Sequence, residues 1–163
     1  MTVLASCVFA ICSAVLLMAS LHDVAVRTVP NAMAAILALA GLAGAAIEGH
    51  LPGSVLAGLV VFAVGALCWR RGWLGGADVK LLAAASVAVP PASILPFILA
   101  VALAGGGLAL IYLCAGPLMR GRRSHQPRRL LARALRAERW RIGRGGPLPY
   151  ACAIAAGFLY VTL

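Results

Sequence analysis

The chain has 163 residues, of which 63% are hydrophobic and 11% are charged. Soluble domains are about 45–50% apolar and about 25% charged, so the composition excludes a soluble globular domain and indicates one integral membrane domain over residues 1–163. The net charge of +10 is concentrated in residues 119–147, which carry ten Arg and one Glu. Because the rest of the chain is close to neutral, we expect no nucleic-acid partner and one basic loop beside a membrane.

Apolar segments separated by Gly, Pro and polar residues predict an all-α bundle of about six transmembrane helices. The first segment lacks the basic residues that precede the apolar core of a signal peptide, so we expect it to be retained as a span. The expected spans are residues 3–22, 32–47, the stretch from the Pro52-Gly53 turn to residue 69, the stretch from residue 78 to the Pro90-Pro91 pair, 92–118 and 148–163. Pro30 ends the first polar break, and Asn31 is predicted to cap the second helix.

Three parts of the chain leave alternatives open. The fourth span has about a dozen residues and covers only about 18 Å, so either neighbouring helices shield it or it begins below the headgroups. Within the basic loop, Leu130, Leu131, Ala134, Leu135 and Trp140 recur at helical spacing. That spacing predicts an amphipathic helix on anionic headgroups, and the alternative is a solvated loop. Gly105–Gly107 indicate either close helix packing or a kink in the fifth span.

The basic residues give the expected orientation. Every Lys and Arg falls in the breaks after the first, third and fifth spans or at the start of the fourth. The positive-inside rule therefore places these breaks on the cytoplasmic side. The sequence does not determine the oligomeric state.

Asp23 and Asp78 are the candidate site. Asp23 ends the first predicted span and Asp78 opens the fourth, so both lie at the cytoplasmic boundary although 55 residues separate them. Ionisable groups at a membrane segment indicate function. Two adjacent carboxylates share a proton, which allows one to act as a base and the other as an acid. Structural alternatives are that Asp78 caps the fourth helix and that Asp23 pairs with Arg27 on one helix face.

Other kinds of site find little support in the sequence. The five cysteines are single and form no C-x-x-C pair, and there is no H-E-x-x-H motif. The sequence therefore predicts no metal site and no cofactor. A proton-relaying transporter would place acidic residues near the bilayer midplane, and none of the predicted spans has one there.

Three stretches resemble the type IV prepilin peptidases, a family of GxGD-type membrane aspartyl proteases. They are Asp23…Arg27-Thr28-Val29-Pro30-Asn31, the glycine-rich stretch Gly75-Gly76-Ala77-Asp78-Val79-Lys80-Leu81-Leu82, and Pro147-Leu148-Pro149-Tyr150-Ala151. The resemblance implies that Asp23 and Asp78 are the catalytic pair, with Asn31, Gly75, Gly76 and Lys80 as supporting motif residues. The family's glycine before the second aspartate is Ala77 here.

The resemblance also implies an activity and a location. We expect an endopeptidase in the bacterial cytoplasmic membrane that removes a short leader from prepilin-like proteins at the cytoplasmic face. The chain lacks the cysteine-bearing insertion of the bifunctional members and is similar to the short peptidase-only members of Flp/Tad pilus systems, so no methyltransferase activity is expected. The alternatives are a non-enzymatic scaffold or small transporter subunit, and a degenerate peptidase that binds pilin without cleaving it.

Overall fold

The computed structural model describes residues 3–119 and 148–162, and every regular element in this part of the chain is a helix. The result confirms the predicted all-α bundle. Except for Met119, the basic loop and the amphipathic helix predicted within it lie outside the described residues. The helices are α1 (Val3–Val26), α2 (Asn31–Ile47), α3 (Leu51–Arg70), α4 (Gly76–Val87), the short 3₁₀ helix η1 (Pro91–Ser93), α5 (Ile94–Met119) and α7 (Tyr150–Thr162).

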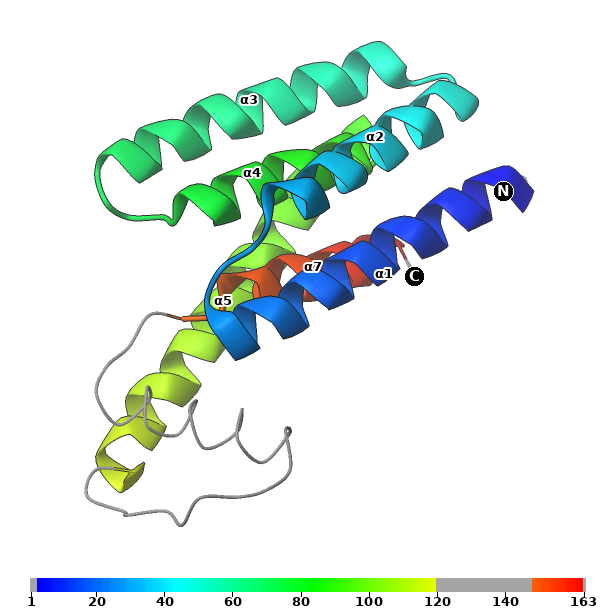
Figure 1. Cartoon of the computed structure of the whole chain (residues 1–163). Helices are drawn as coiled ribbons and strands as arrows, with labels where there is room; N and C mark the ends of the chain where they lie inside the picture. The colour runs from blue at the N-terminus through cyan, green and yellow to red at the C-terminus, as the bar shows by residue number, and fades with distance from the viewer. Residues whose placement is uncertain (1–2, 120–147, 163) are drawn as a thin grey trace.

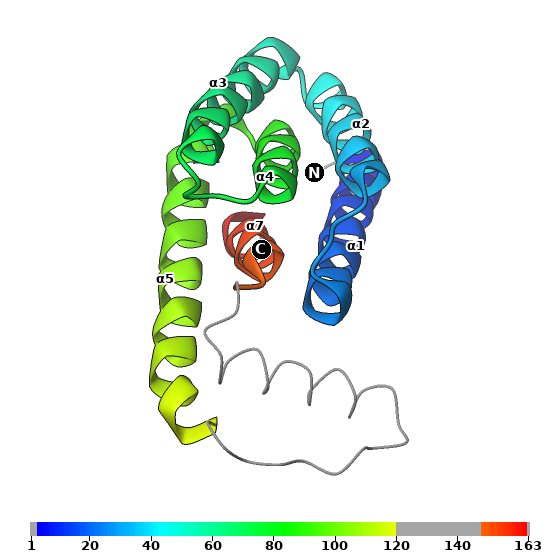
Figure 2. The same cartoon turned by 60° about the vertical axis from the view of Figure 1, so that its left-hand side comes forward.

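α4 and α7 form the centre of the bundle. Figure 2 shows these two helices surrounded by α1, α2, α3 and α5. α4 packs against α2, α3 and α7, and α7 packs against α1 and α5. The buried core draws one large apolar side chain or more from each of five helices, among them Leu16, Leu37, Leu81, Phe97 and Phe158. Because lipid is as apolar as this core, close van der Waals packing between these side chains is what holds the central helices together within a membrane.

Glycines allow the central helices to approach their neighbours closely. Gly58 and Gly65 are two turns apart on α3 and face α4. A Cβ atom at Gly58 would lie 2.4 Å from a methyl carbon of Val87, and one at Gly65 would lie 2.9 Å from a methyl carbon of Val79. Small residues of this kind are typical of helix interfaces in membranes.

Three of the helices are long and apolar enough to cross a membrane: α1, α3 and the η1–α5 segment. α2, α4 and α7 are shorter, with 17, 12 and 13 residues. α4 covers about 18 Å, and α2, α3 and α7 surround it, which agrees with the expectation that neighbouring helices shield it.

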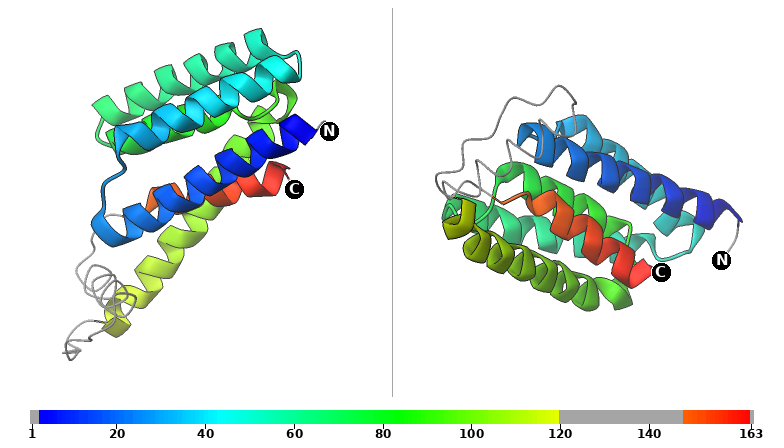
Figure 3. Two further views of the ribbon diagram at one scale, coloured as in Figure 1. Left: turned by 45° about the vertical axis from the view of Figure 1, so that its right-hand side comes forward. Right: turned by 90° about the horizontal axis from the view of Figure 1, so that it is seen from below.

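The candidate residues all lie at one end of the bundle, at the ends of their helices. The end of α1 and the starts of α2, α4 and α7 lie together there, whereas the chain's N- and C-termini lie at the other end (Figures 1 and 3). The basic residues Arg27, Arg70, Arg71 and Lys80 belong to this same end of the helices. One end of the described bundle is therefore distinctly basic.

Two predicted boundaries are wrong. The first helix does not stop at residue 22 but continues to Val26, because an apolar turn follows Asp23 and the Arg27 N–H donates to the Asp23 carbonyl at 2.8 Å. Asp23 is thus part of α1. Asn31 is the first residue of α2 rather than its cap, and Pro30 occupies the cap position without a capping side chain. The Asn31 side chain contacts Lys80 instead.

Candidate active site

Asp23 and Asp78 come from different helices and lie at the same end of the bundle. Asp23 is in the last turns of α1 and only 7% of its surface is exposed. Asp78 is in the first turn of α4 and is half-buried. The negative charge of Asp23 acts on the Asp78 carboxyl. The fold therefore brings close together the two acidic residues that were predicted as a pair, and their catalytic role stays a prediction.

The turn before α4 fixes the position of the Asp78 carboxylate. The carboxylate accepts a backbone hydrogen bond from Gly75, the residue at the N-cap of the helix. A carboxylate that reaches back to the cap in this way satisfies one of the orphan donors of a helix start, so the capping alternative describes part of its role. A Cβ atom on Gly75 would lie 2.7 Å from Asp78 Oδ2. A larger residue at this position would force the carboxylate to shift.

Ala77 fits the backbone without strain. It lies within α4, and the only described non-glycine residue with a positive φ is Arg27. Right-handed helical geometry is open to alanine as readily as to glycine. The departure from the family's glycine therefore needs no unusual backbone conformation at this position.

The surroundings of Asp78 raise the pKa of its carboxyl. This residue lies outside the three helices that are long enough to cross the membrane. Burial raises the pKa of the Asp78 carboxyl to about 6, and the negative charge of Asp23 adds to the increase. The hydrogen bond from Gly75 and the positive charge of Arg27 lower the pKa and oppose both effects. The arrangement can therefore hold one proton between two carboxylates, which is the requirement for paired acid and base chemistry.

α7 is attached to α1 close to Asp23. The Ser20 hydroxyl, nearly one turn before Asp23, lies 2.8 Å from the Leu16 carbonyl oxygen and 3.0 Å from the Ala151 carbonyl oxygen of α7. The Cys152 thiol lies 3.9 Å from the Ser20 carbonyl oxygen. These contacts hold the first turn of α7 against the last turns of α1 and help to bury Asp23.

A second link joins the two motifs that carry the aspartates. Lys80 Nζ donates to Asn31 Oδ1 at 3.0 Å, although 49 residues separate them. The start of α2 is thereby attached to the second turn of α4. Gly76, the other motif glycine, makes room for an indole ring, since a Cβ atom there would lie 3.3 Å from Trp69 Nε1. All four supporting motif residues thus contact neighbours that shape this end of the bundle.

Three residues near the aspartates add features that the sequence reasoning did not assign. Arg27 donates from Nη2 to the Tyr112 hydroxyl at 3.3 Å. The Tyr150 ring packs over Gly105, where a Cβ atom would lie 2.8 Å from it, and the charge of Asp78 acts on the Tyr150 hydroxyl. Tyr150 belongs to the third motif, but Tyr112 lies in an apolar run with no local signal. Of the two alternatives for the glycines of the fifth span, close packing holds at Gly105, and α5 stays helical through all three glycines.

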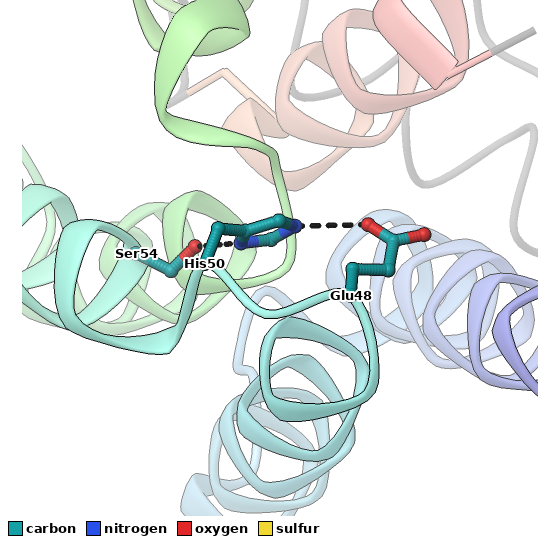
Figure 4. A network of polar contacts seen from close by, with 3 residues as sticks. All are labelled: Glu48, His50 and Ser54. Carbon is teal, nitrogen blue, oxygen red and sulfur yellow. Dashed lines mark hydrogen bonds and ion pairs between the residues drawn. The ribbon is translucent and has the colours of Figure 1, made fainter.

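A separate polar cluster lies between α2 and α3 at the other end of the bundle. Figure 4 shows His50 between Glu48 and Ser54, with His50 Nε2 2.8 Å from Glu48 Oε2 and His50 Nδ1 2.9 Å from Ser54 Oγ. The residue types are those of a serine hydrolase triad. However, Ser54 is fully buried, so its hydroxyl is closed to a substrate. The cluster instead stabilises the turn into α3.

Within the described residues, no three His, Cys, Asp or Glu side chains are grouped so that they could hold a metal ion. The candidate site consists of the carboxylates of Asp23 and Asp78, Arg27, the Asn31–Lys80 pair, Tyr112 and Tyr150.

Comparison with known proteins identifies a family for this chain. The model of the type IV leader peptidase family matches residues 10–110. This range covers more than half of the chain and includes Asp23, Asp78 and the Asn31–Lys80 pair, whereas α7 lies beyond it. No curated protein and no solved structure gives a significant match to the chain.

Proposed function

Because the chain belongs to the type IV leader peptidase family, we propose that it is an aspartyl endopeptidase which removes the short leader from type IV or Flp-type prepilins. The observation that carries the proposal is the coupled pair of carboxylates, one buried on α1 and one half-buried on α4. Both lie at the basic end of the bundle, which the positive-inside rule assigns to the cytoplasmic face. A prepilin would therefore be cut at the inner surface of the bacterial cytoplasmic membrane.

The proposed reaction is hydrolysis by a singly protonated pair. The ionised carboxylate takes a proton from water as the water oxygen attacks the scissile carbonyl carbon, and the protonated carboxyl gives its proton to the carbonyl oxygen. A neutral tetrahedral intermediate with two hydroxyls results. As the C–N bond breaks, the first carboxyl protonates the leaving amine and the second recovers a proton from one hydroxyl. The products are an acid and an amine, and the pair regains its single proton.

The partners follow from the position of the site. The proposed substrate presents its cleavage site at the membrane surface, and the basic loop is expected to contact anionic headgroups. The two carboxylates supply both proton transfers, so the proposed reaction assigns no role to a metal or cofactor.

The test is cleavage of a co-expressed Flp-type prepilin, read as a mobility shift of the pilin. Asp23→Asn and Asp78→Asn keep shape and polarity but remove the titratable groups, and both should abolish cleavage while the protein stays in the membrane. Glu48→Gln is the matched control, because it removes an acidic residue at the opposite end of the bundle and should leave cleavage intact. An intact pilin with the wild-type protein would favour a scaffold, a transporter subunit or a degenerate peptidase. Cleavage by either Asn variant would eliminate the two-carboxylate mechanism.

A further inference from the structure

Arg27 has an unusual backbone. It follows the last residue of α1 with a φ of 60°, and it is the only non-glycine residue in the described ranges with a positive φ. This left-handed conformation is unfavourable for any residue with a side chain, and glycine adopts it freely. Outliers of this kind persist where surrounding contacts over-determine them and are concentrated at functional sites. The contacts of the Arg27 side chain are therefore informative.

The Arg27 side chain crosses from α1 to α5. Its Nη2 donates to the Tyr112 hydroxyl at 3.3 Å over a separation of 85 residues, and the contact is partly buried. Among the described helices, α1 packs against α2 and α7, and its direct contact with α5 is slight. The positive charge of Arg27 also acts on the Asp78 carboxyl. The Arg27 side chain thus contacts α5 and also acts electrostatically on the aspartate pair.

A pair of carboxylates that shares one proton still has one negative charge. Leaving such a charge uncompensated in a partly buried site is costly. An arginine is always protonated at physiological pH, and its planar group can hold a hydroxyl while it faces a carboxylate. We propose that Arg27 is a positioning residue of the aspartate pair, whose guanidinium, anchored on Tyr112, balances the shared negative charge. The inference rests on the proposed function.

The other charged groups nearby do not replace Arg27. On α4, Lys80 donates to Asn31, and on α7 the neighbour of Asp78 is the neutral Tyr150. At the end of α3, Arg70 and Arg71 are exposed, and Arg71 lies over the Trp73 ring. His22 on α1 has its Nδ1 against the Thr28 carbonyl oxygen. Arg27 is the cation whose charge opposes that of Asp23 at Asp78. Charge balance at the pair is therefore assigned to this residue.

The test separates the charge of Arg27 from its contact with Tyr112. Full-length protein in liposomes is assayed for leader cleavage over a range of pH with Arg27→Gln, Arg27→Lys and Tyr112→Phe. Arg27→Gln removes the charge, so the alkaline limb of the profile should move up by about one pH unit. Arg27→Lys keeps the charge and should leave the limb in place. Because both Arg27→Lys and Tyr112→Phe lose the anchor, each should lower the maximal rate roughly tenfold, and the double variant should be no worse than either.

A merely structural Arg27 would lower activity without moving the pH profile, and that result would overturn the proposal. A second measurement is independent of cleavage: the infrared band of the protonated carboxyl that disappears in Asp78→Asn is titrated in each variant. Its midpoint should rise in Arg27→Gln and stay near the wild-type value in Arg27→Lys. If wild-type protein cleaves nothing, the proposed function fails while this titration still decides the inference. An unchanged midpoint in Arg27→Gln refutes it in either case.

Discussion

Gly75→Ala tests whether the exact placement of the Asp78 carboxylate matters. The backbone at Gly75 has φ −72° and ψ 141°, which alanine adopts without strain. The added methyl carbon would lie 2.7 Å from Asp78 Oδ2, whereas ordinary contacts begin at 3.4 Å. The carboxylate must therefore retreat by about 0.7 Å and weaken its hydrogen bond from the Gly75 backbone. We therefore expect this variant to lose cleavage activity while its stability stays nearly unchanged.

We expect Gly75→Ala to fold with nearly unchanged stability, because a compatible Gly→Ala substitution changes the free energy of unfolding by less than about 1 kcal/mol. Its leader cleavage should fall between tenfold and about a hundredfold, since a misplacement of about 1 Å can reduce a rate by about 10²-fold. The assay compares initial rates at equal protein and the midpoint of thermal unfolding. Gly76→Ala is the matched control, because its methyl would lie 3.3 Å from the edge of the Trp69 ring and away from the carboxylate. Full activity in Gly75→Ala would refute the link between carboxylate position and rate.

Four further predictions concern pH, helix packing and the link between α2 and α4. Cleavage should decline as pH rises through about 6, because the proton on Asp78 is lost there; a rate that is constant from pH 5 to 8 contradicts this. The folded state holds that proton more tightly than the unfolded state, so wild-type stability should fall between pH 4 and 6 and Asp78→Asn should remove the decline in thermal unfolding scans. Gly157→Ala should lower stability by about 1–3 kcal/mol, because its methyl would lie 2.9 Å from the Val101 backbone nitrogen. The control Gly106→Ala has nothing within 4 Å of the added methyl and should be neutral or slightly stabilising; equal effects of the two changes would contradict the packing. A double-mutant cycle of Asn31→Ala and Lys80→Met should give a coupling of about 0.5–1 kcal/mol in unfolding, and strict additivity would show that their hydrogen bond contributes nothing.

The helices were predictable from the sequence because apolar segments and helix-breaking residues recur at lengths that the bilayer sets. Boundaries were less certain. The extension of α1 past residue 22 depends on three apolar residues that follow a charged one, Val24 to Val26, and hydropathy places the break at the charge. The capping role expected of Asn31 failed for another reason: its side chain is used by Lys80 on α4, a tertiary contact that local propensity does not contain.

The two aspartates of the candidate site were predictable because acidic residues are rare in this chain. With four acidic residues in 163, two at one boundary were informative, and the structure places them close together. Tyr112 was not predictable, because an isolated tyrosine in an apolar helix has many uses. Arg27 was noted only as an i, i+4 partner of Asp23. Its hydrogen bond to Tyr112 on α5 is a tertiary contact that this local spacing does not contain.

The shortness of α4 is what allows a carboxylate to be held in this bundle. If α4 faced lipid and were long enough to cross the membrane, Asp78 would lie either in the hydrocarbon or among the headgroups. α4 has only 12 residues and is surrounded by α2, α3 and α7. Its first turn therefore lies inside the protein at the basic end of the bundle. Burial there raises the pKa of Asp78 to about 6, while the backbone of Gly75 still donates a hydrogen bond to its carboxylate. Small residues make this placement possible, because the faces of α3 that contact α4 include Gly58 and Gly65. Enlarging those faces should therefore affect the carboxylate pair through the position of α4, although neither glycine touches an aspartate.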